Sequence, residues 1–506
     1  MKEKHRNILA SMLIVAVLTI LGGALYYIRW ELKILTDRLN APSYVTLSIN
    51  GEESRLDLDN SGTTSIELSS LNCEVPVFIS RSENAAIKVF FDNMEVPAEG
   101  LNYQISHLDK NYAIPVTIVN EWNHATATYW LQTWPSTVTS YTVVGQSLYE
   151  GDYYLTSIGE GQHVAMKIGQ DGELKYYKYN AYGAVADFKK VQTDNGIRYL
   201  YFTTIDTRYN SKAVTNLGCY VVMDENFHEI NRLMMMQSEK IPKDGYPVDQ
   251  HDCLYINDGE YYLVTYADQN VTNIPGNIPH KENGSLVAGT IIQGFKDNQL
   301  NFEWSSTDYP EFYAMSADYN DYTNTSGVYN ADYMHFNSIQ KDPKDGNLLL
   351  SFRDLDTIIK INSKTGEIIW RLGGINDDFH LDETQKTSRQ HYAAYTTLGS
   401  ITAFDNGNKN HQSRIVEYWL DEDQKICRDF KSYQIDGYFS AFTGSVQRLD
   451  SQKDVYAIGW GTRTAEEGIN ALYPQYSEID FSTGKTLFEL RFADPTISTY
   501  RCVKIK

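Results

Sequence analysis

The chain has 506 residues, more than one compact core usually holds, because domains run to roughly 100–250 residues and repeat folds are the main exception. Its 44 basic and 65 acidic side chains give a net charge of −21, which argues against a nucleic-acid partner, since phosphate backbones require basic surfaces. A hydrophobic share of 42% excludes a disordered chain, and 38 tyrosines with 33 glycines indicate many short strands and turns.

The first predicted element is a membrane-spanning helix. Residues 7–28 carry no charge, and at about 1.5 Å per residue they cover a hydrocarbon core of roughly 30 Å. Basic residues precede the run and aromatic residues follow its end: Lys2, Lys4, Arg6, Tyr26, Tyr27 and Trp30. We expect residues 1–40 to form a membrane anchor with a short helical stalk from residue 31.

Two interpretations of this segment compete, a retained anchor and a cleaved signal peptide. The apolar run exceeds a usual signal core and has no clean Ala-x-Ala cleavage site, which favours a retained anchor. Three Lys or Arg residues lie on each side of the apolar run, so their count does not decide the orientation. The short head before the run and the long body after it favour an N-terminus in the cytoplasm. We expect a single-pass protein of the cell membrane with its body outside the cytoplasm, or a secreted protein if the segment is cleaved.

Short strands begin after the stalk. Apolar and polar residues alternate at 44–50, 114–119 and 125–133, as they do in half-buried strands. We therefore expect a small antiparallel β-sandwich over residues 41–135. A stretch rich in Pro, Ser and Thr at 135–140 is the expected boundary to the next domain.

Residues 141–506 contain a recurring turn of the type x-x-Gly-polar-apolar. It occurs at Gly172, Gly259, Gly346, Gly366 and Gly484. Glycine supplies the positive φ of a tight hairpin, and hairpins in units of roughly 40–60 residues are typical of propeller blades. Six units are expected, near 144–180, 184–236, 248–306, 333–374, 388–436 and 442–494.

The expected fold is all-β, a six-bladed β-propeller preceded by a small β-sandwich domain and an N-terminal transmembrane helix. The tail Tyr500–Lys506 is expected to pair with the first blade and close the ring, which removes exposed edges. An ordinary two-sheet β protein is the alternative.

A long insert, residues 307–332, separates the third and fourth units. It carries Tyr309, Tyr313, Tyr319, Tyr322 and Tyr329 and runs on to Tyr333. Long loops in compact domains are usually functional or disordered. Two interpretations are open, an aromatic plug that packs on a blade and an aromatic rim that stacks on a flat substrate.

Four residues at the openings of blades are the candidate site. His251, His335 and His391 precede strands of successive units, and Arg353 follows on the next strand of the unit of His335. The innermost strands of propeller blades face one central channel, so we expect these side chains to converge there. Three imidazoles and a guanidinium suit transfer of a tetrahedral oxyanion group, with one imidazole as nucleophile.

Each of these residues also has a purely structural interpretation. A single histidine at the start of a strand is usually a hydrogen-bonded core residue, and three histidines have the spacing of a zinc site. The five cysteines are scattered without a CxxC pair, and Arg353 would place a cation beside a metal. We therefore expect no metal here.

The segments around these residues resemble the bacterial arylsulfate sulfotransferases. The matching segments, at roughly 250–450, are HDCLYINDGEYYLVTY, HFNSIQKDPKDGNLLLSFRDLDTIIKINSKTGEIIWRLGG, RQHYAAYTTLGSITAFDNGN, SRIVEYWL and GSVQRLD. This family moves a sulfuryl group from one phenol to another without a nucleotide donor. The resemblance implies a six-bladed propeller preceded by a small β domain, in agreement with the count of units.

The resemblance also implies roles for individual residues. His391 is similar to the histidine that is transiently sulfated, and His251, His335 and Arg353 to the remaining catalytic residues. Asn337, in the same motif as His335, is a weaker candidate for substrate binding. The expected reaction is ping-pong transfer from an aryl sulfate to a phenol, with no metal and no organic cofactor.

Two other functions remain open. A membrane-anchored propeller that binds glycan or protein without catalysis would suit the anchor and the tyrosine-rich insert equally well. A glycoside hydrolase would need two carboxylates across a cleft, and 65 acidic residues offer too many candidates to name a pair.

Overall fold

The computed structural model describes residues 2–39, 44–49, 52–58, 62–67, 77–80, 86–105, 113–121, 124–134, 138–159, 162–180, 183–205, 216–325, 327, 330–462 and 474–506. The chain divides into two compact units, Met1–Ser136 and Thr137–Lys506. Part of the domain boundary expected at 135–140 lies outside the described residues. Cys73 and Tyr329 lie outside them as well.

The N-terminal element is one continuous helix, α1 (Lys2–Leu39), and the expected stalk is its last part. Its segment Arg6–Thr36 has a hydropathy of 2.5 and is not buried against protein. By length and composition this helix can cross a membrane, a property that an anchor shares with a signal sequence.

The described residues of the first unit after α1 form the expected β-sandwich, with two five-stranded sheets, but not a purely antiparallel one, because β3 pairs with β10 in parallel. One sheet contains β2 (Glu52–Asp57), β1 (Tyr44–Ile49), β4 (Val77–Ser80), β8 (Asn102–Ile105) and β7 (Ala98–Glu99). The other contains β3 (Gly62–Glu67), β10 (Thr126–Trp134), β9 (Ala113–Asn120), β5 (Ile87–Phe91) and β6 (Met94–Val96). Alternate residues of both sheets, such as Val45, Val89 and Ile118, form one buried core between them.

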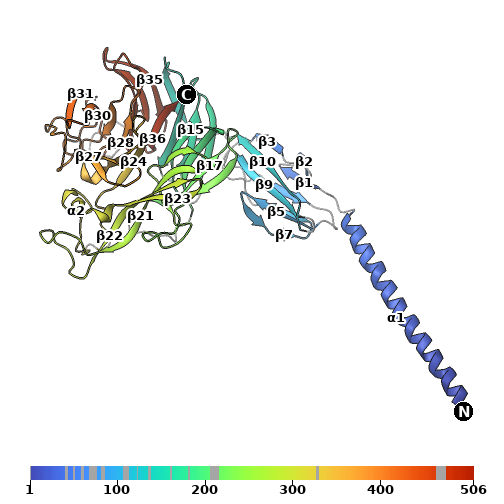
Figure 1. The fold of residues 1–506 in the computed structure, drawn as a ribbon. Coiled ribbons are helices and arrows are strands. Elements are labelled where there is room, and N and C mark those ends of the chain that lie inside the picture. The colour runs from blue at the N-terminus through green and yellow to red at the C-terminus, as the bar shows by residue number, and fades with distance from the viewer. Residues whose placement is uncertain are drawn as a thin grey trace. The chain divides into compact units, whose positions relative to one another are not determined.

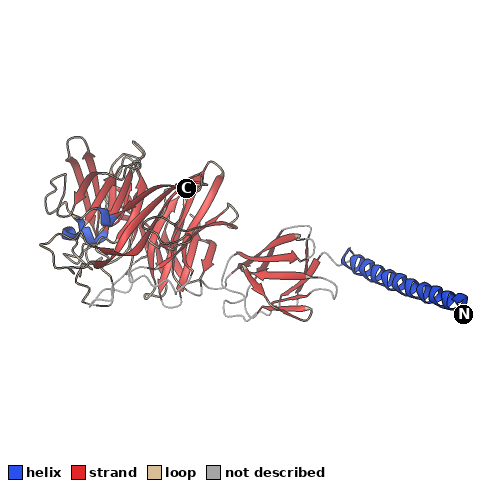
Figure 2. Ribbon diagram, turned by 60° about the horizontal axis from the view of Figure 1, so that its bottom comes forward, coloured by secondary structure: helices blue, strands red, loops and turns tan. Residues whose placement is uncertain are grey.

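The second unit contains six antiparallel sheets, and strands make up most of its regular structure (Figure 2). The first three are β14 (Leu174–Tyr179), β13 (Gln162–Ile168), β12 (Asp152–Gly159) and β36 (Ser498–Ile505); β15 (Val185–Thr193), β16 (Gly196–Thr204), β17 (Leu217–Met223) and β18 (Glu229–Leu233), with β19 (Val248–Asp249) on β17; and β20 (Leu254–Asn257), β21 (Glu260–Val271), β22 (Ser285–Lys296) and β23 (Gln299–Ser305).

The other three sheets follow in chain order. They are β24 (Phe336–Lys341), β25 (Leu348–Phe352), β26 (Thr357–Ile361) and β27 (Ile368–Gly373); β28 (His391–Tyr395), β29 (Ile401–Asp405), β30 (Arg414–Asp421) and β31 (Ile426–Gln434); and β32 (Ser445–Arg448), β33 (Val455–Gly459), β34 (Tyr476–Asp480), β35 (Lys485–Phe492) and β11 (Tyr141–Gly145).

The six sheets are the blades of a closed propeller. Each blade has one strand that contacts the corresponding strand of the next blade, and these contacts run β36, β15, β20, β24, β28, β32 and back to β36. The closing strand β36 pairs with β12, while β11 pairs with β35, so both ends of the unit complete blades begun elsewhere in the chain. The expected six-bladed propeller and its closing C-terminal strand are confirmed, and Figure 1 shows β36 beside β15.

The insert at 307–332 is largely an aromatic plug. Three of its rings, Tyr313, Tyr322 and Tyr333, are at most 2% exposed and pack on one another in the core that the third and fourth blades share. Tyr309 stacks on Trp304, and its hydroxyl donates to the carbonyl of Gly366. For these four rings the interpretation as an open rim is wrong, because the shared core covers their faces. Tyr319 is half-buried outside this core, and the charges of Asp318 and Arg353 act on its hydroxyl, so for this ring the rim stays a prediction.

Candidate active site

The three candidate histidines lie where inner strands begin. His251 precedes β20, His335 precedes β24 and His391 is the first residue of β28. Because these strands contact one another in succession around the ring, the three side chains come together, although they lie far apart in sequence. The rings of His251 and His335 meet edge to face with their centroids 5.0 Å apart.

His251 and His335 are each held by a carboxylate. The Nδ1 atom of His251 lies 2.8 Å from Asp249 Oδ2, and that of His335 lies 2.8 Å from Asp332 Oδ2. An ionised carboxylate only accepts hydrogen bonds, so whenever the partner carboxylate is ionised the ring has a proton on Nδ1. The Nε2 atoms then carry lone pairs that can accept a proton.

His391 is held by an amide instead. Its Nδ1 atom lies 2.7 Å from Asn406 Oδ1, and Asn406 donates from Nδ2 to the carbonyls of Ser440 and Thr443. Those two bonds fix which end of the amide faces the ring, so Nδ1 of His391 donates and Nε2 carries the lone pair. The backbone N–H of Thr443 donates a hydrogen bond to this Nε2, with 3.2 Å between the two nitrogen atoms.

Burial controls the charge of the site. It lowers the pKa of His391 well below its usual value, and the positive charge of Arg353 lowers it further. Burial also lowers the pKa of His335 to about 3 and raises that of Asp332 to about 7. Both histidines are therefore neutral at physiological pH, and the contact of His335 with Asp332 is a hydrogen bond rather than an ion pair.

Arg353 supplies the positive charge. It lies just beyond the end of β25 rather than on the strand, in a 3₁₀ turn whose first N–H donates to the carbonyl of His335. Its guanidinium is 3% exposed and donates from Nη1 to Asp354. Burial raises the pKa of Asp354.

Asn337 lies behind the histidines. It is fully buried, and its Nδ2 donates to the carbonyl of Gln390, the residue before His391. Its side-chain oxygen has no hydrogen-bond partner among the described residues. This geometry favours positioning of His391 over direct contact with substrate.

An exposed aromatic ring adjoins the site. Phe442 is 42% exposed, and the guanidinium carbon of Arg353 lies 5.0 Å from its ring centroid. It precedes Thr443, whose N–H reaches His391. Sequence reasoning missed Phe442 because it lies in a loop of another blade, without a motif of its own.

Four charged groups form a network that contacts the backbone of the site. Arg501, on the closing strand β36, lies 2.7 Å from Asp187 and 3.4 Å from Asp252, and Lys189 lies 2.6 Å from each of the same two carboxylates. Arg501 also donates to the carbonyl of Asn337. The two positive charges balance the two negative ones in the interior.

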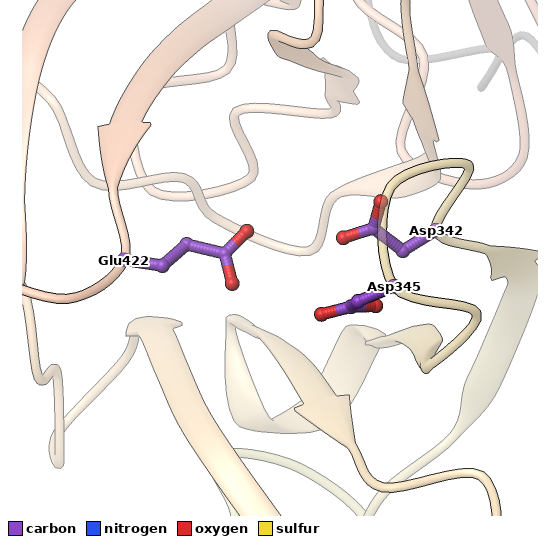
Figure 3. Close-up of side chains that lie close together, drawn as sticks. All are labelled: Asp342, Asp345 and Glu422. Carbon is purple, nitrogen blue, oxygen red and sulfur yellow. The ribbon is translucent and has the colours of Figure 1, made fainter.

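Among the described residues, one group of carboxylates has the geometry for a metal ion, Asp342, Asp345 and Glu422 (Figure 3). The ammonium group of Lys360, whose side chain is 1% exposed, lies 2.5, 2.8 and 2.7 Å from these three side chains. Nζ therefore supplies the positive charge that the cluster requires. This group joins the fourth and fifth blades through side chains of both.

The fold and the site together define a six-bladed propeller in which three histidines at the starts of inner strands and an arginine just beyond β25 lie near one another. The family model "Arylsulfotransferase (ASST)" matches residues 236–501, more than half of the chain and including all four of these residues. The chain belongs to the arylsulfotransferase family. No curated protein matches the chain.

Solved structures give only distant likenesses. The β-propeller domain of Cps50 (Swd1) from Myceliophteria thermophila is 8% identical over 69% of this chain and 88% of that chain, with a TM-score of 0.35. A quinonprotein alcohol dehydrogenase-like protein from Bacteroides thetaiotaomicron is 10% identical over 88% and 96%, with a TM-score of 0.29. The dihydro-heme d1 dehydrogenase NirN is 10% identical with a TM-score of 0.32, and the matched region covers 69% of this chain and 58% of NirN.

Proposed function

We propose that the protein transfers a sulfuryl group from an aryl sulfate to a phenol through a transient sulfohistidine on His391. The observation that carries this proposal is the orientation of the His391 ring. Asn406 accepts the proton of Nδ1, burial keeps the ring neutral, and Nε2 has a lone pair that accepts one hydrogen bond, from the Thr443 N–H. The charges of Arg353, His251 and His335 act on the same ring.

In the first half-reaction, Nε2 of His391 attacks sulfur, the new N–S bond forms and the bond from sulfur to the aryl oxygen breaks. The Arg353 guanidinium stabilises the sulfuryl oxygens, and the Thr443 N–H, which donates to Nε2 of the free ring, turns to these oxygens as the N–S bond forms. Each well-placed donor contributes about 3–4 kcal/mol to such a transition state. The aryl oxygen leaves as phenoxide beside Arg353 and takes its proton from solvent, because neutral His335 has its only proton on Nδ1.

In the second half-reaction, the acceptor phenol replaces the departed phenol. His251 or His335 takes the phenol proton at Nε2, the phenol oxygen attacks sulfur and the N–S bond breaks. His391 returns to its neutral form with Nδ1–H still on Asn406. We propose that Phe442 supports the aryl ring in both steps, since its exposed ring adjoins Arg353.

The test uses the full chain in detergent with 4-nitrophenyl sulfate, a phenol and no nucleotide sulfate donor. We expect release of nitrophenol that depends on the acceptor, and we expect His391→Asn to abolish it. His124→Asn is the matched control, because His124 is an exposed residue of the sandwich unit. Full activity of His391→Asn, or no transfer by the wild-type protein, would contradict the proposal, and the second result would favour a non-catalytic binding propeller.

We also propose that α1 is a retained anchor with the propeller outside the cytoplasm. The support is that, among the described residues, one helix is long and apolar enough to cross a membrane. The expected result in intact cells is that an external protease digests the propeller, while the helix stays with the membrane fraction. Protection of the propeller, or its release without the helix, would overturn this topology.

A further inference from the structure

One part of the insert does not belong to the aromatic plug. The segment 316–320 lies at the site itself, where the backbone N–H of Ala317 donates to the carbonyl of Asp354 at 2.8 Å. The next residue, Asp318, has a side chain that is 43% exposed. The mechanism above uses neither residue.

The carboxylate of Asp318 lies between two guanidinium groups. Its Oδ2 atom is 3.6 Å from Nη1 of Arg353 and 3.7 Å from Nη2 of Arg389. The same oxygen therefore contacts both Arg353, which is proposed to bind the sulfuryl group, and Arg389, which has no role in the proposed reaction. In the structure Asp318 is the anion next to Arg353 on the exposed side.

Arg389 is held in place by strained backbone. Arg389 and Asp356 both have positive φ angles, 62° and 52°, and Asp356 Oδ1 accepts from both the backbone N–H and Nη1 of Arg389. Such strain persists only where surrounding contacts enforce it, and it is concentrated at functional sites. The guanidinium is 14% exposed and therefore has a defined place beside the site.

The charges around this point are unequal. Arg353 is paired with the buried Asp354 and Arg389 with the buried Asp356, so Asp318 is a third carboxylate for two guanidinium groups. A bound oxyanion must displace Asp318 or lie beside it. Either way, the electrostatic cost that Asp318 imposes grows with the charge of the ligand.

We propose that Asp318 is the residue through which this site selects a singly charged tetrahedral group, as in a sulfate monoester, over a doubly charged one, as in a phosphate monoester. The proposal deepens the proposed function and rests on its assignment of Arg353 to the oxyanion. Asp318 is here a specificity-determining residue rather than a catalytic one.

The test compares two ligands that cannot be transferred, benzenesulfonate with one charge and phenylphosphonate with two, at about pH 8.5. Their binding to the full chain in detergent is measured by calorimetry. We expect Asp318→Asn to strengthen sulfonate binding about 3-fold and phosphonate binding about 10-fold, because the effect of one removed charge doubles in free energy for a doubly charged ligand. Asp318→Ser, which removes the charge with another shape, is expected to give the same pattern.

The matched control is Asp308→Asn in the same insert. The Asp308 side chain is 56% exposed and pairs with Lys240, so its loss changes the total charge equally without a contact to Arg353. We expect no change in the ratio of the two affinities. Equal gains for both ligands, no gain, or no binding of either ligand to any of the proteins would overturn the proposal.

Failure of the proposed function is a separate result. It appears as absence of nitrophenol release by the wild-type protein, whereas the binding ratios concern ligands that undergo no reaction. A protein that binds both ligands with the expected ratios but transfers no sulfuryl group retains this inference and loses the sulfohistidine mechanism.

Discussion

The oxygen atom bound at Nδ1 distinguishes the three histidines of the site. Asp249 and Asp332 bind His251 and His335, while the neutral amide of Asn406 binds His391. A carboxylate partner holds the ring through Nδ1 and offers a negative charge to it, which suits a residue that exchanges protons with a phenol, although at His335 burial outweighs this and lowers the pKa to about 3. An amide fixes the ring without a charge, which suits a nucleophile that must remain unprotonated.

Removal of the amide tests this difference. We expect Asn406→Ala to lower kcat by about 100-fold with little change in KM, because the ring of His391 loses its orientation and its tautomer is no longer fixed. Steady-state kinetics with 4-nitrophenyl sulfate measure the effect. Asn410→Ala, an exposed residue of the same loop, serves as control and is expected to keep wild-type kcat. Unchanged kcat in Asn406→Ala would show that the amide does not orient the nucleophile.

The lowered pKa of His391 predicts an unusual pH profile. An imidazole of ordinary pKa near 6.5 would be mostly protonated at pH 5, and its nucleophilic reaction would slow by about 30-fold relative to pH 8. Because burial keeps His391 neutral, we expect the burst of nitrophenol to slow by less than about 3-fold over this range. Rapid-mixing measurements of the burst rate at each pH test this expectation. A fall in the burst rate centred near pH 6.5 would contradict the lowered pKa of His391.

At this scale the sequence predicts some positions well and others poorly. His251, His335 and His391 could be selected because each adjoins an inner strand, and Arg353 because it follows β25 in the blade of His335. The aspartates lie two or three residues before their histidines, and Asn406 lies 15 residues after His391 in the same matching segment, so these signals could have been used. Phe442 and Asp318 reach the site from another blade and from the insert, without a motif that relates them to it.

Among the elements, the closing strand β36 has the widest influence on the site. Its Arg501 contacts Asp187 and Asp252, and its Tyr500 donates to the carbonyl of His251 at 3.0 Å. Arg501 donates to the carbonyl of Asn337, two residues after His335, and it pairs with Asp252, the residue after His251. One strand therefore both completes the first blade and aligns residues from other blades.

Loss of this arginine leaves two buried carboxylates with one lysine. We expect Arg501→Met to lower the free energy of unfolding by about 3–5 kcal/mol, because an uncompensated buried charge is costly. Arg428→Met, which breaks an ion pair whose arginine is 51% exposed, is expected to cost less than about 1 kcal/mol. Urea denaturation of both variants gives the comparison, and equal small losses would show that the network is unimportant for stability.

The propeller blades and the insert differ in how well a sequence pattern predicts them. Glycines at tight turns mark the hairpins, so the number of blades and their approximate limits follow from the sequence. The insert could not be resolved in the same way, because a tyrosine that packs in a core and one that lines an open rim have the same composition. Contacts with Trp304 and with the core of the third and fourth blades make the difference here.

For the whole molecule, the net charge of −21 opposes the approach of an anionic substrate. Salt screens this repulsion, and at physiological ionic strength the Debye length is about 8 Å. We expect kcat/KM for the aryl sulfate to rise about 2- to 5-fold between low and physiological ionic strength, while KM for a neutral phenol stays constant. Initial rates in two different salts test this, and a fall with added salt would mean that attraction by the arginines outweighs the acidic surface.

The position of β36 at the end of the propeller has a consequence for biosynthesis. A ribosome adds Ser498–Ile505 after every other blade strand, so the nascent chain carries an open edge at β12 and lacks both Tyr500 and Arg501 until that moment. The earlier blades can form as they are made. The contacts of Tyr500 and Arg501 beside the candidate histidines form only when this strand is added, so a chain whose translation stops early carries these histidines without those contacts.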